Sequence, residues 1–217
     1  MPATEKPILI RRGDLRGQAA AVYIPRRGRG ARHYADSFSV GLWLCKLDPE
    51  KGAEWAYDFA GALVGLVPEG TQLVATPPPS RRRSAAGWYF ARELGIAVAR
   101  RLNIPLARPL RWADQGRESS KDLVHHAGKG RALGRRVVCD EDLTGLRVCL
   151  VDDLWTTGIT LEVCARALRE VGAEWPPGVV SLAVTEDTRA RPKEERRRRV
   201  SKRKMRQDRR HEGSGIA

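Results

Sequence analysis

The chain has 217 residues, of which 41% are apolar and 30% are charged, and 40 Lys and Arg against 26 Asp and Glu give a net charge of +14. This length predicts one domain with appendages or two very small domains, with enough apolar residues to build a core. Because no run approaches the roughly 18 apolar residues of a membrane span, and residues 1–12 lack the apolar stretch of a secretory signal, we expect a cytoplasmic protein with no membrane partner.

The first quarter of the chain predicts few regular elements. Residues 1–36 are basic and rich in Gly, with one short strand expected at 20–24, and residues 1–50 suggest an N-terminal extension or hood. Apolar residues at helical spacing then predict a helix over 52–67, which Pro68 ends.

A strand, a stiff loop and a second helix are expected next. Residues 71–76 predict a short buried strand, and the three prolines that follow Thr76 exclude both helix and inner strand. Apolar residues on one face predict a helix over 84–102, with Ser84 as its N-cap. Residues 111–136 show little periodicity, and a loop of this length is usually either functional or disordered.

Two strongly apolar segments follow, with a helical pattern between them. Residues 147–151 and 179–185 predict strands that are covered on both faces, and residues 158–172 predict a helix. This alternation is typical of right-handed βαβ crossovers. We therefore expect an α/β fold, a parallel β-sheet flanked by helices, with a variable hood formed by 1–50 and 107–146.

The positive charge is concentrated near the end of the sequence. Residues 189–210 contain 13 Lys and Arg and 3 Asp and Glu, a net charge of +10. Such a segment buries too little apolar surface to offset the entropy of ordering. We expect a domain over 1–188 and a basic tail over 189–217, disordered or helical. The tail either binds nucleic-acid phosphates without sequence specificity or only aids solubility.

The cysteines predict neither a zinc site nor a disulfide framework. Structural zinc sites usually contain C-x-x-C pairs, and disulfide frameworks are typical of small secreted chains. We expect reduced, buried thiols. The cysteines are Cys45, Cys139, Cys149 and Cys164.

The segment 148–161, V-C-L-V-D-D-L-W-T-T-G-I-T-L, carries the most specific signal. A buried strand leads into two carboxylates, Asp152 and Asp153, and then into a turn that opens a helix. The helix N-terminus offers unpaired N–H groups and a positive dipole end, and Gly158 lets the backbone close around an anion. The carboxyl end of a parallel strand is also where ligands bind in open α/β sheets.

The side chains of this segment favour a sugar phosphate. Hydroxyls of Thr156, Thr157 and Thr160 add hydrogen-bond donors for a phosphate. The two adjacent carboxylates suit a diol or Mg²⁺, both of which prefer oxygen acceptors. A phosphate site beside a diol site describes a ribose 5-phosphate. The alternative is that the carboxylates end a solvated strand and the threonines form an ordinary helix cap.

The segment 148–161 resembles the phosphoribosyl-pyrophosphate (PRPP) signature of type I phosphoribosyltransferases. The similarity extends more weakly over 71–185, and the chain resembles the ComF-like phosphoribosyltransferases most. The resemblance implies the family's fold and its reaction, the transfer of ribosyl 5-phosphate from PRPP to a nitrogen acceptor with release of pyrophosphate. It also implies Mg²⁺ as the cofactor.

The resemblance assigns roles to particular residues. It implies that Asp152 and Asp153 are catalytic, bind the ribose hydroxyls and contact Mg²⁺ indirectly. It implies that the turn after them binds the 5-phosphate and that the proline-rich loop binds pyrophosphate. These residues are Thr156, Thr157, Gly158 and Thr160 for the 5-phosphate, and Thr76, Pro77, Pro78, Ser80 and Arg81 for pyrophosphate.

Further residues of the site are less specific. Lys121 and Lys129 lie in the long loop, where they either close over pyrophosphate or are surface lysines. Trp155 is bulky for its place between the carboxylates and the turn, and its neighbours place it near the site. No side chain stands out as a general base.

Two functions are consistent with these features. The first is an Mg²⁺-dependent phosphoribosyltransferase whose acceptor the sequence does not name. The second is a non-catalytic ComF-type module that senses PRPP or a nucleotide and binds nucleic acid through 189–210. The expected partners are PRPP and a nitrogen acceptor, with nucleic acid and a second copy of the chain as further candidates.

Overall fold

The computed structural model describes residues 6–26, 30–79, 88–107, 110–113 and 136–186. The chain divides into two compact units, Met1–Thr185 and Glu186–Ala217. Every element described below belongs to the first unit. Because residues 187–217 lie outside the described residues, the basic tail and the boundary at 188 stay predictions.

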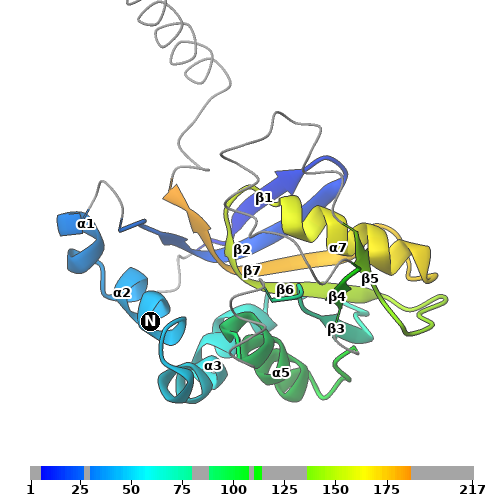
Figure 1. The fold of residues 1–217 in the computed structure, drawn as a ribbon, viewed down its shortest axis with the longest axis horizontal. Coiled ribbons are helices and arrows are strands. Elements are labelled where there is room, and N and C mark those ends of the chain that lie inside the picture. The colour runs from blue at the N-terminus through cyan, green and yellow to red at the C-terminus, as the bar shows by residue number, and fades with distance from the viewer. Residues whose placement is uncertain (1–5, 27–29, 80–87, 108–109, 114–135, 187–217) are drawn as a thin grey trace, which may run out of the picture. The chain divides into compact units, whose positions relative to one another are not determined.

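A five-stranded sheet forms the centre of the first unit (Figure 1). Its order is β1-β2-β7-β6-β3; β1 pairs with β2 antiparallel, and all the other neighbours pair in parallel. This confirms the predicted parallel sheet. The strands are β1 (Ile8–Arg12), β2 (Leu15–Tyr23), β3 (Leu73–Ala75), β6 (Val148–Trp155) and β7 (Gly178–Thr185).

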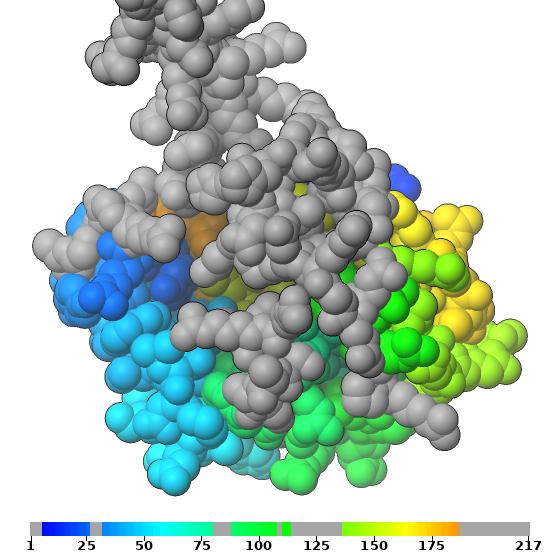
Figure 2. Space-filling model, viewed as in Figure 1, coloured from blue at the N-terminus to red at the C-terminus, as the bar shows by residue number. Residues whose placement is uncertain are grey.

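Helices cover both faces of the sheet, as expected for an α/β fold (Figure 1). Successive strand residues point to opposite faces, so Leu150 of β6 packs with Leu161 in one core cluster and Val151 packs with Leu94 in the other. The first cluster lies under α7 (Ile159–Glu170). The second lies under α2 (Ser37–Cys45), α3 (Pro49–Val64) and α5 (Phe90–Leu102). Figure 2 shows α3 and α5 side by side on one face.

The smaller elements lie outside these two layers. A short helix, α1 (Gly30–Ala35), precedes α2. A second sheet consists of β4 (Arg111–Trp112) and β5 (Val137–Val138), which pair antiparallel. Residues 137–138 therefore pair with the first residues of the segment that was predicted to lack periodicity.

The N-terminal residues contribute more to the sheet than the sequence predicted. A single short strand was expected at 20–24, whereas β1 and β2 form a hairpin over 8–23. Alternate residues of the hairpin, among them Ile10 and Leu15, are buried, and Gly13 takes a φ of 57° in the turn between the strands. β2 then pairs in parallel with β7, which makes this part of the predicted hood an integral part of the sheet.

The predicted helices are confirmed with shifted ends. The helix expected over 52–67 is α3, which begins earlier because Asp48 caps it by accepting hydrogen bonds from two first-turn N–H groups. The second helix ends at Asn103, which has a left-handed φ of 54°. Its described part begins at Phe90, and the predicted N-cap Ser84 lies outside the described residues. No helix within the described ranges is long and apolar enough to cross a membrane.

The cysteines are all free thiols, as expected, and Cys45, Cys149 and Cys164 are buried. Burial raises the pKa of the Cys45 thiol to about 11 and that of the Cys149 thiol to about 12. Because the thiolate is the reactive form, these groups are poorly nucleophilic near neutral pH. Cys139 is only half-buried, although burial raises its pKa as well.

We expect iodoacetamide at pH 8 to alkylate Cys139 first in the native protein. Cys45, Cys149 and Cys164 should react only after unfolding in urea, because burial blocks access and suppresses the thiolate. Peptide mass mapping over time measures both rates. Native labelling of Cys149 as fast as that of Cys139 would contradict the burial of β6.

Candidate functional site

The two carboxylates lie within β6 and not after its end. The strand was expected to end at 151, but its pairing with β7 continues to Trp155. Ser181 of β7 secures this extension, because its hydroxyl accepts a hydrogen bond from the Trp155 N–H at 3.0 Å and donates to the Ala183 carbonyl at 2.8 Å. The extended strand therefore carries Asp152 and Asp153 to the edge of the sheet in a fixed orientation.

The two side chains face opposite sides of the sheet. Asp153 is buried at 4% exposure, and its Oδ1 lies 2.7 Å from Nζ of Lys46, just after α2. Asp152 is half-buried and faces α7. Burial and, after it, the charge of Asp152 raise the pKa of the Cys164 thiol on α7 well above its ordinary value. The Asp152 Oδ1 also accepts a hydrogen bond from the Asp153 N–H at 2.8 Å.

The predicted phosphate turn lies at the start of α7. Thr156 and Thr157 are exposed, and Thr160 is half-buried in the first helical turn. Gly158 is the N-cap and makes no side-chain cap, so the first N–H groups of α7 have no partner within the helix. Free N–H groups and the positive end of the helix dipole favour an anion at this end of a helix.

Gly158 is enclosed by two side chains. Its φ is 71°, which favours glycine. A Cβ at this position would lie 2.5 Å from the Trp155 ring and 2.9 Å from Cδ of Arg12. Trp155 was expected near the site, and it does lie beside the turn, but at 2% exposure its ring is part of the core. The ring packs against the turn from the protein interior and is not available for stacking on a ligand.

Arg12, which is not among the residues predicted for the site, also contacts the turn. It is the last residue of β1, and its Nη1 donates to the Thr157 carbonyl at 2.8 Å. Its Nε donates to Glu162 in the first turn of α7. The signal that could have found it is the alternation Ile8, Ile10, Arg12 before the Gly13-Asp14 turn, which places Arg12 on the inward face of a strand.

The proline-rich loop reaches the same edge of the sheet. β3 pairs in parallel with β6, with Ala75 opposite Leu150, so the loop after β3 and the end of β6 are neighbours. The Thr76 side chain, however, is 7% exposed; it hydrogen-bonds Tyr89, and its methyl group would lie 2.2 Å from a Cβ on Gly95. The Thr76 hydroxyl thus points into the protein.

The remaining described residues of this loop shape the site but offer few hydrogen-bond donors to a phosphate. Pro77 and Pro78 are buried, and a proline has no N–H to offer a phosphate. The Pro79 carbonyl accepts a hydrogen bond from Nε1 of Trp112 at 2.9 Å, which anchors the loop. The other predicted pyrophosphate residues, Ser80 and Arg81, and the loop lysines, Lys121 and Lys129, lie outside the described residues.

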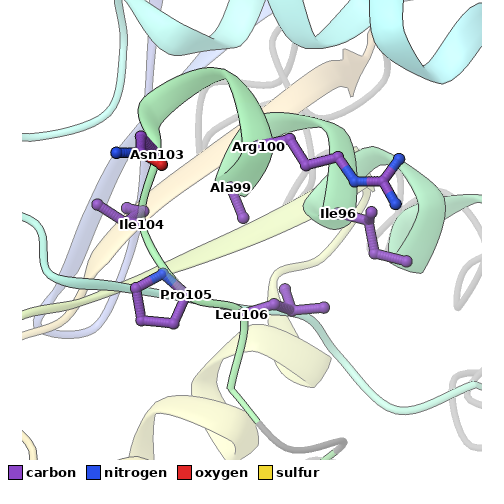
Figure 3. A pocket seen from close by; sticks show the side chains of 7 residues that line it. All are labelled: Ile96, Ala99, Arg100, Asn103, Ile104, Pro105 and Leu106. Atoms are coloured by element: carbon purple, nitrogen blue, oxygen red, sulfur yellow. The ribbon is translucent and has the colours of Figure 1, made fainter.

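A shallow hollow of about 420 Å³ lies elsewhere, between the last turns of α5 and the segment that follows it (Figure 3). Ile96 and Ala99 point from α5 toward Pro105 and Leu106, and the one charged lining residue is Arg100. Because α5 returns the chain to pair alongside β3, the hollow lies toward the amino-terminal edge of the sheet. It is therefore separate from the carboxylates and the turn.

Comparison with known protein families gives a match over the part of the chain that contains β6 and α7. A family model described as "Phosphoribosyl transferase domain" matches residues 93–214, more than half of the chain. The chain belongs to this family. The matched range includes the acid pair, the turn and all of α7. The protein is thus a phosphoribosyltransferase, an enzyme of phosphoribosyl transfer.

Solved phosphoribosyltransferase structures also resemble the chain. A purine phosphoribosyltransferase from Pyrococcus horikoshii Ot3 is 19% identical, with 61% of this chain and 73% of that chain covered and a TM-score of 0.37. An adenine phosphoribosyltransferase from Thermoanaerobacter pseudethanolicus is 20% identical over 64% of this chain and 82% of that one, with a TM-score of 0.38. No curated protein matches the chain.

Mutation of the Lys46–Asp153 ion pair tests the site geometry of this phosphoribosyltransferase. Lys46→Met removes the cation that lies 2.7 Å from the buried Asp153 carboxylate and should lower the free energy of unfolding by about 3–5 kcal/mol. Adding Asp153→Asn should recover much of the loss, because the buried charge is then gone. Urea denaturation measures both values.

Lys51→Met is the matched control. Lys51 lies 3.9 Å from Asp48, both side chains are well exposed, and exposed pairs contribute at most about 1 kcal/mol. Equal losses for Lys46→Met and Lys51→Met would show that Lys46 and Asp153 are not a buried pair in solution.

Proposed function

We propose that the protein binds PRPP and transfers its ribosyl 5-phosphate to a nitrogen acceptor, releasing pyrophosphate. The observation that carries this proposal is the adjacency of three features at one edge of the sheet. The half-buried Asp152, the helix N-terminus at Gly158 and the proline loop after β3 lie on neighbouring strand ends. We assign Asp152 to the diol, the start of α7 to the 5-phosphate and the loop after β3 to the pyrophosphate of PRPP.

The phosphate would bind at the start of α7. The first N–H groups of the helix, with the exposed hydroxyls of Thr156 and Thr157, can donate to the phosphate oxygens. Thr160 adds a donor from the first turn. Because these groups belong to a turn braced by Trp155 and Arg12, the donors are preorganised and little ordering is needed on binding.

Asp152 and Asp153 have different roles in this proposal. Asp152 faces the same side of the sheet as α7, so its carboxylate can accept from the ribose hydroxyls of a ligand whose phosphate lies at Gly158. Asp153 is engaged by Lys46 on the other side. We assign Asp152 the direct contact with the sugar and Asp153 the task of holding the end of β6.

The donor set is compatible with Mg²⁺ bound mainly by the substrate. Mg²⁺ is commonly held by one or two carboxylates together with substrate phosphates and water, and Asp152 would supply the carboxylate oxygen. When bound, Mg²⁺ would neutralise charge on the pyrophosphate leaving group. In the transfer, the bond from the sugar C1 to pyrophosphate oxygen breaks and a bond from C1 to the acceptor nitrogen forms.

Thermal denaturation with PRPP and Mg²⁺ tests the proposal. A ligand at 100 times its dissociation constant stabilises the native state by about 2.7 kcal/mol, a rise in Tm of roughly 5–10 °C for a chain of this size. Asp152→Asn should abolish most of this rise, because a hydrogen bond to a charged group contributes about 1.5–3 kcal/mol.

The controls separate binding from folding. Asp58→Asn removes an exposed carboxylate of α3 and should leave the rise in Tm intact. Asp153→Asn should lower the Tm without ligand but retain part of the rise. The proposal is wrong if PRPP with Mg²⁺ does not raise the Tm of the unmodified protein. Pyrophosphate release with a panel of purine and pyrimidine bases then identifies the acceptor.

A non-catalytic ComF-type module, the alternative that the sequence left open, is not favoured, because the chain belongs to the phosphoribosyl transferase domain family. Nucleic-acid binding through 189–210 and assembly with a second copy remain predictions, and residues 189–210 lie outside the described residues. Deleting 189–217 should flatten the salt dependence of DNA or RNA binding, because the slope scales with the phosphates neutralised. PRPP binding should be unchanged. A truncated protein with the full salt slope would place the nucleic-acid surface elsewhere.

A further inference from the structure

We propose that Arg12 is a positioning residue for the sugar-phosphate turn, acting on the turn and on Glu162 without contacting the substrate. This inference rests on the proposed function, because Arg12 would set the shape and the charge of the phosphate site that the proposed function requires. Arg12 reaches the turn from a strand about 145 residues away in sequence, so the N-terminal hairpin becomes part of the site.

The first contact orients a peptide group. The Thr157 carbonyl accepts a hydrogen bond from Nη1 of Arg12 at 2.8 Å. In a trans peptide the carbonyl and the following N–H point in opposite directions. Holding the Thr157 carbonyl toward Arg12 therefore turns the Gly158 N–H away from it, and this N–H is one of the donors expected to bind the phosphate.

The second contact sets the charge at the start of α7. Glu162 lies in the first turn of the helix, where a carboxylate competes with a ligand phosphate for the positive end of the dipole. The guanidinium of Arg12 pairs with this carboxylate, and the two side chains are about one-third exposed, 34% and 32%. Pairing draws the negative charge toward β1 and lowers its repulsion of a bound phosphate.

The third contact limits the movement of the turn. A Cβ on Gly158 would lie 2.9 Å from Cδ of Arg12 and 2.5 Å from the Trp155 ring, so both side chains pack closely against this residue. Gly158 has the greatest conformational freedom of the residues in this turn. Its enclosure by two side chains restricts that freedom before any ligand binds.

Separate fragments of PRPP test this role. Ribose 5-phosphate should occupy the turn, whereas pyrophosphate with Mg²⁺ should occupy the loop after β3. Calorimetry on Arg12→Gln should show ribose 5-phosphate binding weakened by about tenfold to a hundredfold, the range for losing a charged hydrogen bond. Pyrophosphate binding should stay within twofold, and in the full reaction KM for PRPP should rise more than kcat falls.

Three further variants make the test specific. Arg11→Gln, the neighbouring exposed residue of β1, is the matched control and should bind both fragments as the unmodified protein does. Arg12→Lys should recover only part of the affinity, because one ammonium cannot reproduce the forked contacts of a guanidinium. Adding Glu162→Gln to Arg12→Gln should strengthen ribose 5-phosphate binding relative to Arg12→Gln alone, because it removes the uncompensated carboxylate.

The outcomes are distinguishable. Normal ribose 5-phosphate affinity in Arg12→Gln would overturn the inference and leave the proposed function standing. Parallel loss of both fragments together with a lower Tm would also overturn it, because Arg12 would then be a general structural residue. If Arg12→Gln is too unstable to assay, full recovery in Arg12→Lys would contradict the inference. Failure of the unmodified protein to bind either fragment or PRPP would overturn the proposed function as well.

Discussion

The parallel pairing of β6 with β7 past the acid pair is the constraint on which the candidate site depends. The ladder continues to Trp155, and Ser181 anchors this last residue through the Trp155 N–H. A strand that ended at 151 would leave both carboxylates on a free loop. Because the strand instead holds them in its pleat, Asp152 faces α7 and Asp153 faces Lys46. The turn at Gly158 then begins directly over the Trp155 ring.

Charge at the site is balanced by residues from the N-terminal quarter of the chain. Lys46 pairs with Asp153 on one face of the sheet, and Arg12 pairs with Glu162 on the other. The carboxylates come from β6 and α7, whereas both cations come from elements that precede β3. A phosphate that binds beside these carboxylates therefore meets groups already compensated by cations. The N-terminal segment thus contributes to the site by electrostatics as well as by completing the sheet.

The sequence predicted the elements whose pattern is local and missed the contacts that depend on distant pairing. The apolar run of β6, the helix after Gly158 and the chain reversal at Asn103 each have a signal within a few residues. The extension of β6 to Trp155 depends on Ser181, and the burial of Thr76 depends on Tyr89 and Gly95. Lys46 is a single cation in a basic region, and no local pattern distinguishes it from a surface residue. Arg12 has a local signal in the alternation with Ile8 and Ile10, but its contact with Thr157 spans 145 residues and has none.

A crystal structure of the protein with PRPP and Mg²⁺ would test most directly whether the start of α7 and Asp152 bind the sugar phosphate. We expect the 5-phosphate within hydrogen-bond distance of the backbone N–H groups over 158–160, with a ribose hydroxyl on the Asp152 carboxylate and the Arg12 bond to the Thr157 carbonyl retained. A phosphate bound instead in the hollow beside Arg100, or a ribose held by Asp153 after Lys46 has moved away, would contradict this expectation.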